Sequence, residues 1–388
     1  MATDWDVIVV GAGIEGSATA YELAKAGQRT LLLEQFPLPH SRGSSHGHSR
    51  IIRKAYSEDY YARMMVDAYC MWHDLEQQSS TSLIRPTGLL TVCKGRNPIV
   101  NSLKNIGSKY RELTAEQMAS EYPMLNFPAE YSGVYDYDGG VINADKALAA
   151  YQREFVKLGG VIRDEEGVNR IEPGSLVAVH TNKDRYSSKK IVIAAGPWTN
   201  KLTEPLGLKL PLKMKCIGVY YWRDDTARGD FSAARGFPAY SEFPPGSPSS
   251  AGIYAVPSSE YPRFCKVCLH NGVEIDPDDR DKISDGMKQK YLESISDYVK
   301  QHMPGLNPKP SISETCIYTL TPDENFILDA HPDHPNVIIA AGFSGHGFKL
   351  APVVGRILTE LAVKPQSLTY DLTPFKISRF AGKIKSNL

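Results

Sequence analysis

Four short runs of apolar residues predict the strands of a parallel sheet. The runs cover residues 6–10, 30–33, 190–195 and 337–341. Continuous apolar runs of this length are typical of strands that are buried on both faces. Ile14, Ala18 and Tyr21 lie between the first two runs and are spaced to share one face of a helix. The chain therefore begins with a predicted strand–helix–strand unit.

Segments in which apolar and polar residues alternate predict a second sheet. Residues 88–93 and 264–270 alternate in this way, and each lies in a longer stretch with several such segments. Alternation is typical of antiparallel strands. A helix is expected over 281–303, because Ile283, Met287, Ile295 and Val299 are spaced to pack on this sheet. The Pro- and Ser-rich run 243–250 predicts a loop or lid.

The predicted fold class is therefore α/β, with a Rossmann-like domain and an inserted α+β domain whose sheet is mainly antiparallel. A length of 388 residues fits two domains, each with its own core. The predicted nucleotide-binding domain is discontinuous and the predicted substrate domain interrupts it. The bounds are 1–82, 141–211 and 317–388 for the first domain, and 83–140 and 212–316 for the second.

The charge balance narrows the class of partner. The chain has 44 basic and 44 acidic side chains, so no net field favours nucleic acid or an acidic membrane surface. No apolar run approaches the span of a bilayer. The first residues include Asp4 and Asp6, where a secretory signal would be basic. We expect a soluble protein that acts on a small molecule and is not secreted by that route.

Cysteine usage predicts reduced thiols and no metal site. Six cysteines are scattered along the chain, without the spacing of a disulfide framework. Cys265 and Cys268 form a C-x-x-C, but no second pair completes a zinc site. On a strand, a spacing of three places the two sulfurs on opposite faces. We interpret them as buried structural thiols.

The first strand leads into a glycine-rich turn that predicts a dinucleotide site. Gly11, Gly13 and Gly16 form a G-x-G-x-x-G pattern, and Glu34 closes the second strand. In this arrangement backbone amides and a helix N-terminus face a pyrophosphate, while the acidic residue accepts the ribose hydroxyls. Because a carboxylate repels a 2′-phosphate, Glu34 disfavours NADPH. NAD and FAD both remain open.

Two further groups of charged residues are candidates for substrate binding. Arg50 and Arg53 lie among apolar residues shortly after the fingerprint, which suits an anion site better than a solvated surface. Lys266 and His270 are four residues apart on an alternating segment, so they share one face of the predicted strand.

A glycine-rich segment near the C-terminus is the third candidate. Residues 340–349 allow backbone amides to approach a planar ligand, and Lys349 supplies a fixed charge beside it. An ordinary turn before a helix explains the glycines equally well. Upstream, Cys316 stands alone, and its spacing gives it no special role.

Together these segments resemble those of one known family. Along nearly its whole length, the chain is similar to the FAD-dependent amine oxidases typified by monomeric sarcosine oxidase. The motifs that carry the resemblance lie at residues 11–16, 44–53, 316–324 and 342–349.

The resemblance implies FAD rather than NAD, joined covalently by a thioether from the flavin 8α-methyl group to Cys316. It implies that Arg53 and Lys349 hold the substrate carboxylate and that Lys266 activates oxygen. It also implies that the site is lined by His46, Arg50, Tyr254, His270 and Tyr318. With the fingerprint and the C-terminal loop included, the predicted cofactor contacts are Gly11, Gly13, Gly16, Glu34, Ser44, His46, Arg50, Cys316, Tyr318, Gly342, Phe343, Ser344, Gly345, His346, Gly347 and Lys349.

The predicted activity is oxidation of a secondary amino acid to an imine, with reduction of O2 to H2O2. Sarcosine, L-pipecolate and L-proline are the candidate substrates, and the family implies a monomer. Two alternatives share the fold. One is a flavin amine dehydrogenase that passes electrons to a carrier protein, and the other is a redox-inert FAD-binding module.

The last three residues predict a cellular address. Ser386, Asn387 and Leu388 resemble the peroxisomal Ser-Lys-Leu signal, with asparagine where a basic residue is usual. We therefore expect a peroxisomal protein that is recognised by the peroxisomal import receptor.

Overall fold

The structure is a computed structural model of the chain, and it describes residues 5–95, 97–243 and 252–382. The predicted loop or lid at 243–250 lies outside these ranges, apart from Phe243. The C-terminal tripeptide also lies outside them. None of the helices in the described ranges is long and apolar enough to cross a membrane.

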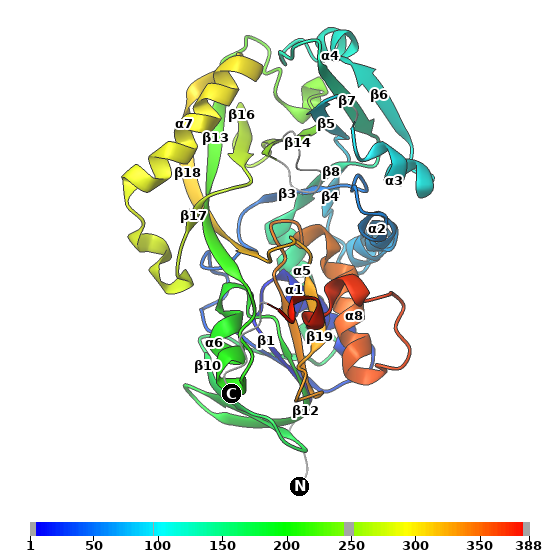
Figure 1. Cartoon of the computed structure of the whole chain (residues 1–388), viewed down its shortest axis with the longest axis vertical. Helices are drawn as coiled ribbons and strands as arrows, with labels where there is room; N and C mark the ends of the chain where they lie inside the picture. The colour runs from blue at the N-terminus through cyan, green and yellow to red at the C-terminus, as the bar shows by residue number, and fades with distance from the viewer. Residues whose placement is uncertain (1–4, 96, 244–251, 383–388) are drawn as a thin grey trace.

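The first sheet, in the lower half of Figure 1, contains eight strands among the described residues. Strands β20, β12, β1, β2 and β9 lie side by side in that order and are parallel, while β19 and the β10–β11 pair are antiparallel additions. The strands are β1 (Trp5–Val10), β2 (Thr30–Leu33), β9 (Val161–Arg163), β10 (Val168–Glu172), β11 (Val177–Thr181), β12 (Arg185–Ile193), β19 (Ile327–Ala330) and β20 (Val337–Ala341).

All four apolar runs that predicted parallel strands are found in this sheet, which confirms that prediction. Only β12 differs clearly from its predicted range, because it begins at Arg185 and ends at Ile193. Its polar first half is a strand because β11 pairs with it, so hydrogen bonding extends the strand beyond the apolar run.

Helices cover the parallel sheet. Ile14, Ala18 and Tyr21 of α1 are all buried, as their spacing predicted, and α1 packs against α5 and α8. The α1–α8 contact is close, since a Cβ at Gly355 would lie 2.8 Å from the backbone of Ala18. The helices are α1 (Ile14–Lys25), α2 (Asp59–Ser79), α3 (Val100–Asn105), α4 (Ala115–Glu121), α5 (Ala144–Lys157), α6 (Thr199–Thr203), α7 (Asp285–His302) and α8 (Ala351–Val363).

The second sheet, in the upper half of Figure 1, contains nine strands among the described residues and is mainly antiparallel. This confirms the predicted fold class. Strands β5 and β14 form a parallel pair. The strands are β5 (Leu89–Lys94), β6 (Tyr110–Thr114), β7 (Tyr131–Asp136), β13 (Lys213–Asp224), β14 (Ala239–Phe243), β15 (Ile253–Pro257), β16 (Phe264–Leu269), β17 (Val273–Glu274) and β18 (Leu306–Leu320).

The alternation in β5 does not give it a solvent face. Leu90 and Val92 join one hydrophobic cluster, whereas Leu89 and Cys93 join another. Cys265 and Cys268 of β16 likewise belong to different clusters and are fully buried, which confirms their prediction as structural thiols on opposite faces.

The helix predicted over 281–303 is shorter than expected. It begins at Asp285 and is preceded by a 3-10 segment, Pro277–Lys282. Ile283 therefore lies before the helix, in extended backbone, and its predicted place on the helical face was wrong. Ile295 and Val299 are fully buried in the core of the second sheet, as predicted. The side chain of Met287 is outside the described residues.

Two features connect the sheets. The long antiparallel pair β13–β18 runs down the left side of Figure 1, with Lys213 opposite Leu320 at one end and Asp224 opposite Leu306 at the other. The strands β3 (Ser49–Ile52), β4 (Ile84–Arg85) and β8 (Gly140–Asn143) form a small sheet in the order β3–β8–β4.

We propose the two-domain division expected from the sequence. Its support is that the strands of each large sheet come from the segments assigned to one domain, except that β18 crosses the bound at 316/317.

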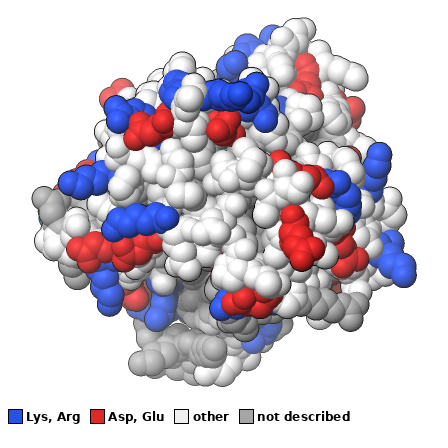
Figure 2. Space-filling view, turned by 90° about the horizontal axis from the view of Figure 1, so that it is seen from above, with Lys and Arg blue, Asp and Glu red and all other residues white. Residues whose placement is uncertain are grey.

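Figure 2 shows basic and acidic side chains side by side on the face that it presents, in keeping with the balanced composition.

Candidate active site

A cavity of about 460 Å³ brings the predicted site residues together. Its walls come from the glycine-rich turn after β1, the segment 43–53, strands β16 and β18, and the loop after β20. A volume of this size is typical of a site for a small molecule or cofactor. All of the predicted site residues line it except Gly16 and Gly342.

The turn after β1 has the close packing that a dinucleotide cradle requires. Gly11 has a φ of +102°, and a Cβ there would lie 2.4 Å from the carbonyl oxygen of Ala194. A Cβ at Gly16 would lie 1.8 Å from the carbonyl oxygen of Gly11, so this glycine shapes the turn without lining the cavity. The glycines leave backbone amides and the start of α1 open to a ligand, so the cradle fits a nucleotide pyrophosphate.

Glu34 lies at the end of β2 and is 6% exposed. Its carboxylate accepts hydrogen bonds from the amides of Ala12, at 2.9 Å, and Phe36, at 3.1 Å. The side chain thus braces the turn from beneath. Glu34 Oε1 also lies 3.5 Å from His40 Nε2. Oε2 keeps a further lone pair for a ribose hydroxyl, and the predicted role of Glu34 stays a proposal.

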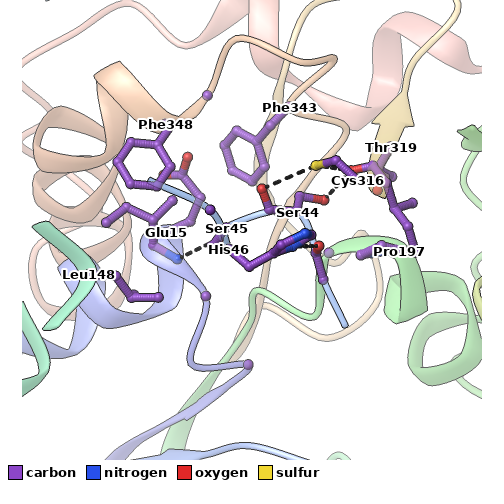
Figure 3. Close-up of a pocket in the computed structure, with 18 of the residues that line it drawn as sticks. Glu15, Ser44, Ser45, His46, Leu148, Pro197, Cys316, Thr319, Phe343 and Phe348 are labelled. Atoms are coloured by element: carbon purple, nitrogen blue, oxygen red, sulfur yellow. Dashed lines mark hydrogen bonds between the residues drawn. The ribbon is translucent and has the colours of Figure 1, made fainter. Parts of the chain in front are cut away.

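Ser44 and Cys316 join the segment 43–53 to β18 (Figure 3). Ser44 Oγ donates to the carbonyl of Ile317 at 2.5 Å, and Cys316 Sγ lies 3.6 Å from the carbonyl oxygen of Ser44. Cys316 is buried at the cavity wall, opposite Ile217 in the β13–β18 pair. Its thiol therefore lies at the cavity wall on a strand that is paired with β13.

Arg50 binds the backbone of its own segment. Its guanidinium donates to the carbonyls of Ser49, at 2.8 Å, Ser44, at 3.0 Å, and His46, at 2.6 Å. Its carbon Cζ also lies 5.5 Å from the ring centre of Phe348. Arg50 therefore fixes the loop, and its charge reaches the cavity without a free fork for a carboxylate.

Arg53 and Lys349 have a different environment. Both are buried, at 6% and 7% exposure, and neither forms an ion pair within the described ranges. Arg53 donates to the carbonyl of Ala55 and lies 4.5 Å from the ring centre of Tyr56. Lys349 Nζ donates to the carbonyl of His346 at 3.1 Å. Burial, followed by the charges of Arg53 and Arg50, holds the pKa of Lys349 well below its usual value.

Lys266 and His270 face the cavity from the same side of β16 and the residue after it. Lys266 is 3% exposed and donates to the carbonyl of Ser49 at 3.2 Å. Burial and the charges of Lys349 and Arg53 lower the pKa of His270 to about 4, so its imidazole is neutral at physiological pH. Tyr254 and Tyr318, whose hydroxyls interact, complete this wall.

The loop after β20 brings backbone into the cavity. Gly345 has a φ of +77°, and a Cβ there would lie 2.4 Å from the His270 ring. Gly342 has a φ of +66° and packs on Thr321 instead of lining the cavity. Phe343, Ser344, His346 and Gly347 do line it. The segment is therefore part of the site as well as a turn before α8.

Two residues of the cavity wall that the sequence did not single out are Ser45 and Glu15. Ser45 Oγ accepts a hydrogen bond from the amide of Ile14 at 2.9 Å, and so ties the segment 43–53 to the cradle. Glu15 is buried beside Phe348 in Figure 3, and neither of its carboxylate oxygens has a partner within the described residues. Burial raises the pKa of Glu15 to about 8, and the charge of Lys349 opposes that shift. Glu15 occupies a variable position of the fingerprint, which carried no signal.

A dinucleotide cradle that opens onto buried cations is the arrangement of a nucleotide-dependent oxidoreductase. The model of the FAD dependent oxidoreductase family matches residues 6–361, and the chain belongs to that family. The cofactor of the cradle is therefore FAD.

Relatives match over the full length. The chain is 47% identical to the peroxisomal sarcosine oxidase of Homo sapiens over 388 residues, which covers 99% of this chain and 98% of that protein. It is 34% identical to the monomeric sarcosine oxidase of Bacillus sp. (strain NS-129), with 99% of each chain covered. Among solved structures, NikD, an unusual amino acid oxidase essential for nikkomycin biosynthesis, superposes with a TM-score of 0.81 at 25% identity and covers 96% of this chain and 97% of that one.

The Glu15 carboxyl group predicts a pH dependence of stability. Its pKa is about 8 in the folded protein against 4.5 ordinarily, so the folded state retains a proton that the unfolded state releases between these values. Stability is therefore lost as pH rises through this window. Glu15→Gln cannot ionise at this position. We expect its free energy of unfolding, relative to that of the unmodified protein, to increase by on the order of a few kcal/mol as the pH rises from about 5 to about 8.

Thermal unfolding of both proteins across this pH range measures the difference. Glu22→Gln is the matched control, because it removes a carboxyl group from the partly exposed face of the same helix. A difference between Glu15→Gln and the unmodified protein that stays constant with pH would show that Glu15 is ionised in the fold.

Proposed function

We propose that the chain is an FAD-dependent oxidase of secondary amino acids. It transfers two electrons from the substrate through FAD to O2 and releases an imine and H2O2. The observation that carries this proposal is the pair Arg53 and Lys349, two buried cations without a carboxylate partner in the described ranges, which share a cavity with the dinucleotide cradle. A substrate carboxylate supplies the missing negative charge.

The other residues of the cavity suit an amine substrate. Bound FAD supplies the acceptor for a hydride. The cations Arg53, Lys266 and Lys349 disfavour a further positive charge, so they favour the neutral form of the substrate amine. The neutral amine is the form whose adjacent carbon can release a hydride. The neutral His270 offers a hydrogen bond without adding charge.

Lys266 has the properties required of a residue that assists oxygen. An ammonium group held in a buried cavity stabilises the negative charge that develops when O2 accepts electrons. Lys266 is fully enclosed and lines the cavity together with Cys316 and Tyr318. We assign it this role, separate from the carboxylate-binding role of Arg53 and Lys349.

The activity is tested by peroxide release from the purified FAD-containing protein. We expect H2O2 with at least one of sarcosine, L-pipecolate and L-proline. Piperidine, which is L-pipecolate without the carboxylate, should have a kcat/KM lower by on the order of a hundredfold or more, because two charge-assisted contacts are lost. No peroxide with any of the three acids would contradict the proposal. A dehydrogenase that uses a carrier protein would release little peroxide, and an inert FAD-binding module none.

We also propose that the flavin is joined to Cys316 through a thioether. The burial of the thiol at the cavity wall supports this assignment. Acid precipitation should leave the flavin in the pellet of the unmodified protein and release it from Cys316→Ala. Cys268→Ala is the matched control, because it alters a buried neighbour of Cys316 in the same cluster and should retain the flavin. Flavin release from the unmodified protein would exclude the linkage.

Peroxisomal localisation is proposed from two observations. The relatives from Homo sapiens and Mus musculus are named as peroxisomal, and the chain ends in Ser386-Asn387-Leu388. A fluorescent protein fused to the N-terminus of the full chain should reach peroxisomes, and deletion of the three residues should leave it in the cytosol. A cytosolic full-length fusion would contradict the proposal.

A further inference from the structure

Lys266 shares its main hydrogen-bond acceptor with a second cation. Its Nζ lies 3.2 Å from the carbonyl oxygen of Ser49, and Arg50 Nη1 donates to the same oxygen at 2.8 Å. Lys266 forms no ion pair within the described ranges, although it is only 3% exposed. A buried ammonium beside a guanidinium readily loses its proton, so another group is needed to keep it charged.

The carboxylate that compensates the charge of Lys266 is Glu260, in the segment between β15 and β16. Its Oε1 accepts hydrogen bonds from Ser49 Oγ and from the Tyr221 hydroxyl, both at 3.2 Å. Lys266 Nζ lies 3.5 Å from the same Ser49 Oγ. A hydroxyl accepts through its lone pairs and donates one hydrogen, so Ser49 can accept from Lys266 while it donates to Glu260. A continuous series of hydrogen bonds therefore links Lys266, Ser49 and Glu260.

The charges around Lys266 act in opposite directions. Burial and then Arg50, on β3, lower the pKa of Lys266, while Cys268 on its own strand, Glu260, and Cys316 on β18 raise it. Glu260 is the one carboxylate among these groups. Burial alone would raise the pKa of Glu260, but backbone hydrogen bonds and the charge of Lys266 outweigh it, so Glu260 is ionised at physiological pH. Arg85 on β4 also faces Glu260.

We propose that Glu260 is a positioning residue that keeps Lys266 in its ammonium form through the Ser49 hydroxyl. This inference rests on the proposed function, because it concerns the charge that Lys266 presents to O2. The proposal explains why a carboxylate lies near a buried lysine with which it forms no direct hydrogen bond. It also gives Ser49, which is 1% exposed, a task beyond closing the small sheet.

The test uses the holoenzyme and two readouts. The first is the rate at which O2 reoxidises the substrate-reduced enzyme, followed from about pH 6 to about pH 10. The second is a pH titration of the visible flavin spectrum of the oxidised, substrate-free enzyme, which needs no turnover. The titration step that is present in the unmodified protein and absent in Lys266→Met reports the ionisation of Lys266.

Glu260→Gln should move both the alkaline fall of the reoxidation rate and the spectral step down by about one pH unit or more, because it removes the opposing charge. Above the new pKa this corresponds to about a tenfold slower reoxidation. The rate of flavin reduction by substrate should stay within about twofold, since Arg53 and Lys349 are untouched. Ser49→Ala should shift both readouts in the same direction, and Glu260→Asp should restore them.

Glu274→Gln is the matched control, because it removes a carboxylate from an exposed strand of the same sheet. A Glu260→Gln enzyme in which neither readout shifts overturns the inference. So does a shift that Glu260→Asp fails to restore, because that outcome assigns Glu260 a merely structural role. If Lys266→Met is reoxidised normally, the oxygen role of Lys266 in the proposed function fails, and the spectral step still decides the inference.

Discussion

The site depends on one constraint: positively charged side chains are buried there without a carboxylate in direct contact. Arg53, Lys266 and Lys349 are each less than a tenth exposed, and none pairs with a carboxylate of the described ranges. An isolated buried charge is strongly destabilising, so a fold that keeps three of them must offset that cost through hydrogen bonds and through what binds there. Burial, followed by the charges of Lys349 and Arg53, lowers the pKa of His270, and burial raises the pKa of Glu15. The cavity is therefore prepared for an anion.

Three separate parts of the chain meet to create this field. Arg53 follows a strand of the small sheet, Lys266 lies on the antiparallel sheet, and Lys349 follows the loop after the parallel sheet. The long pair β13–β18 spans the region and presents Cys316 at the cavity wall. Neither large sheet alone contains the site. Arg53 and Lys349 come from segments outside the inserted sheet, whereas Lys266 reaches the cavity from β16 of that sheet.

Much of the fold followed from local patterns. The apolar runs of β1, β2 and β20 need no tertiary information, because their continuous hydrophobicity already predicts burial on both faces. Local patterns could not predict that the polar half of β12 is a strand. Nor could they predict that the helix begins only at Asp285, after Ile283. Pairing with β11 sets the first, and a 3-10 segment before Asp285 sets the second. The cradle glycines were predictable because each has a steric reason, whereas the resemblance alone pointed to Cys316. The buried Glu15 and the Lys266–Ser49–Glu260 chain had no signal, since both arise from contacts between distant segments.

The most direct test of amino acid oxidation in this cavity is the visible spectrum of the purified protein in the absence of oxygen, while sarcosine, L-pipecolate and L-proline are added in turn. If the cavity binds a carboxylate and delivers a hydride to FAD, at least one of these acids bleaches the flavin absorption and admission of air restores it. A flavin that stays oxidised with all three would show that the buried cations serve some purpose other than binding an oxidisable amino acid.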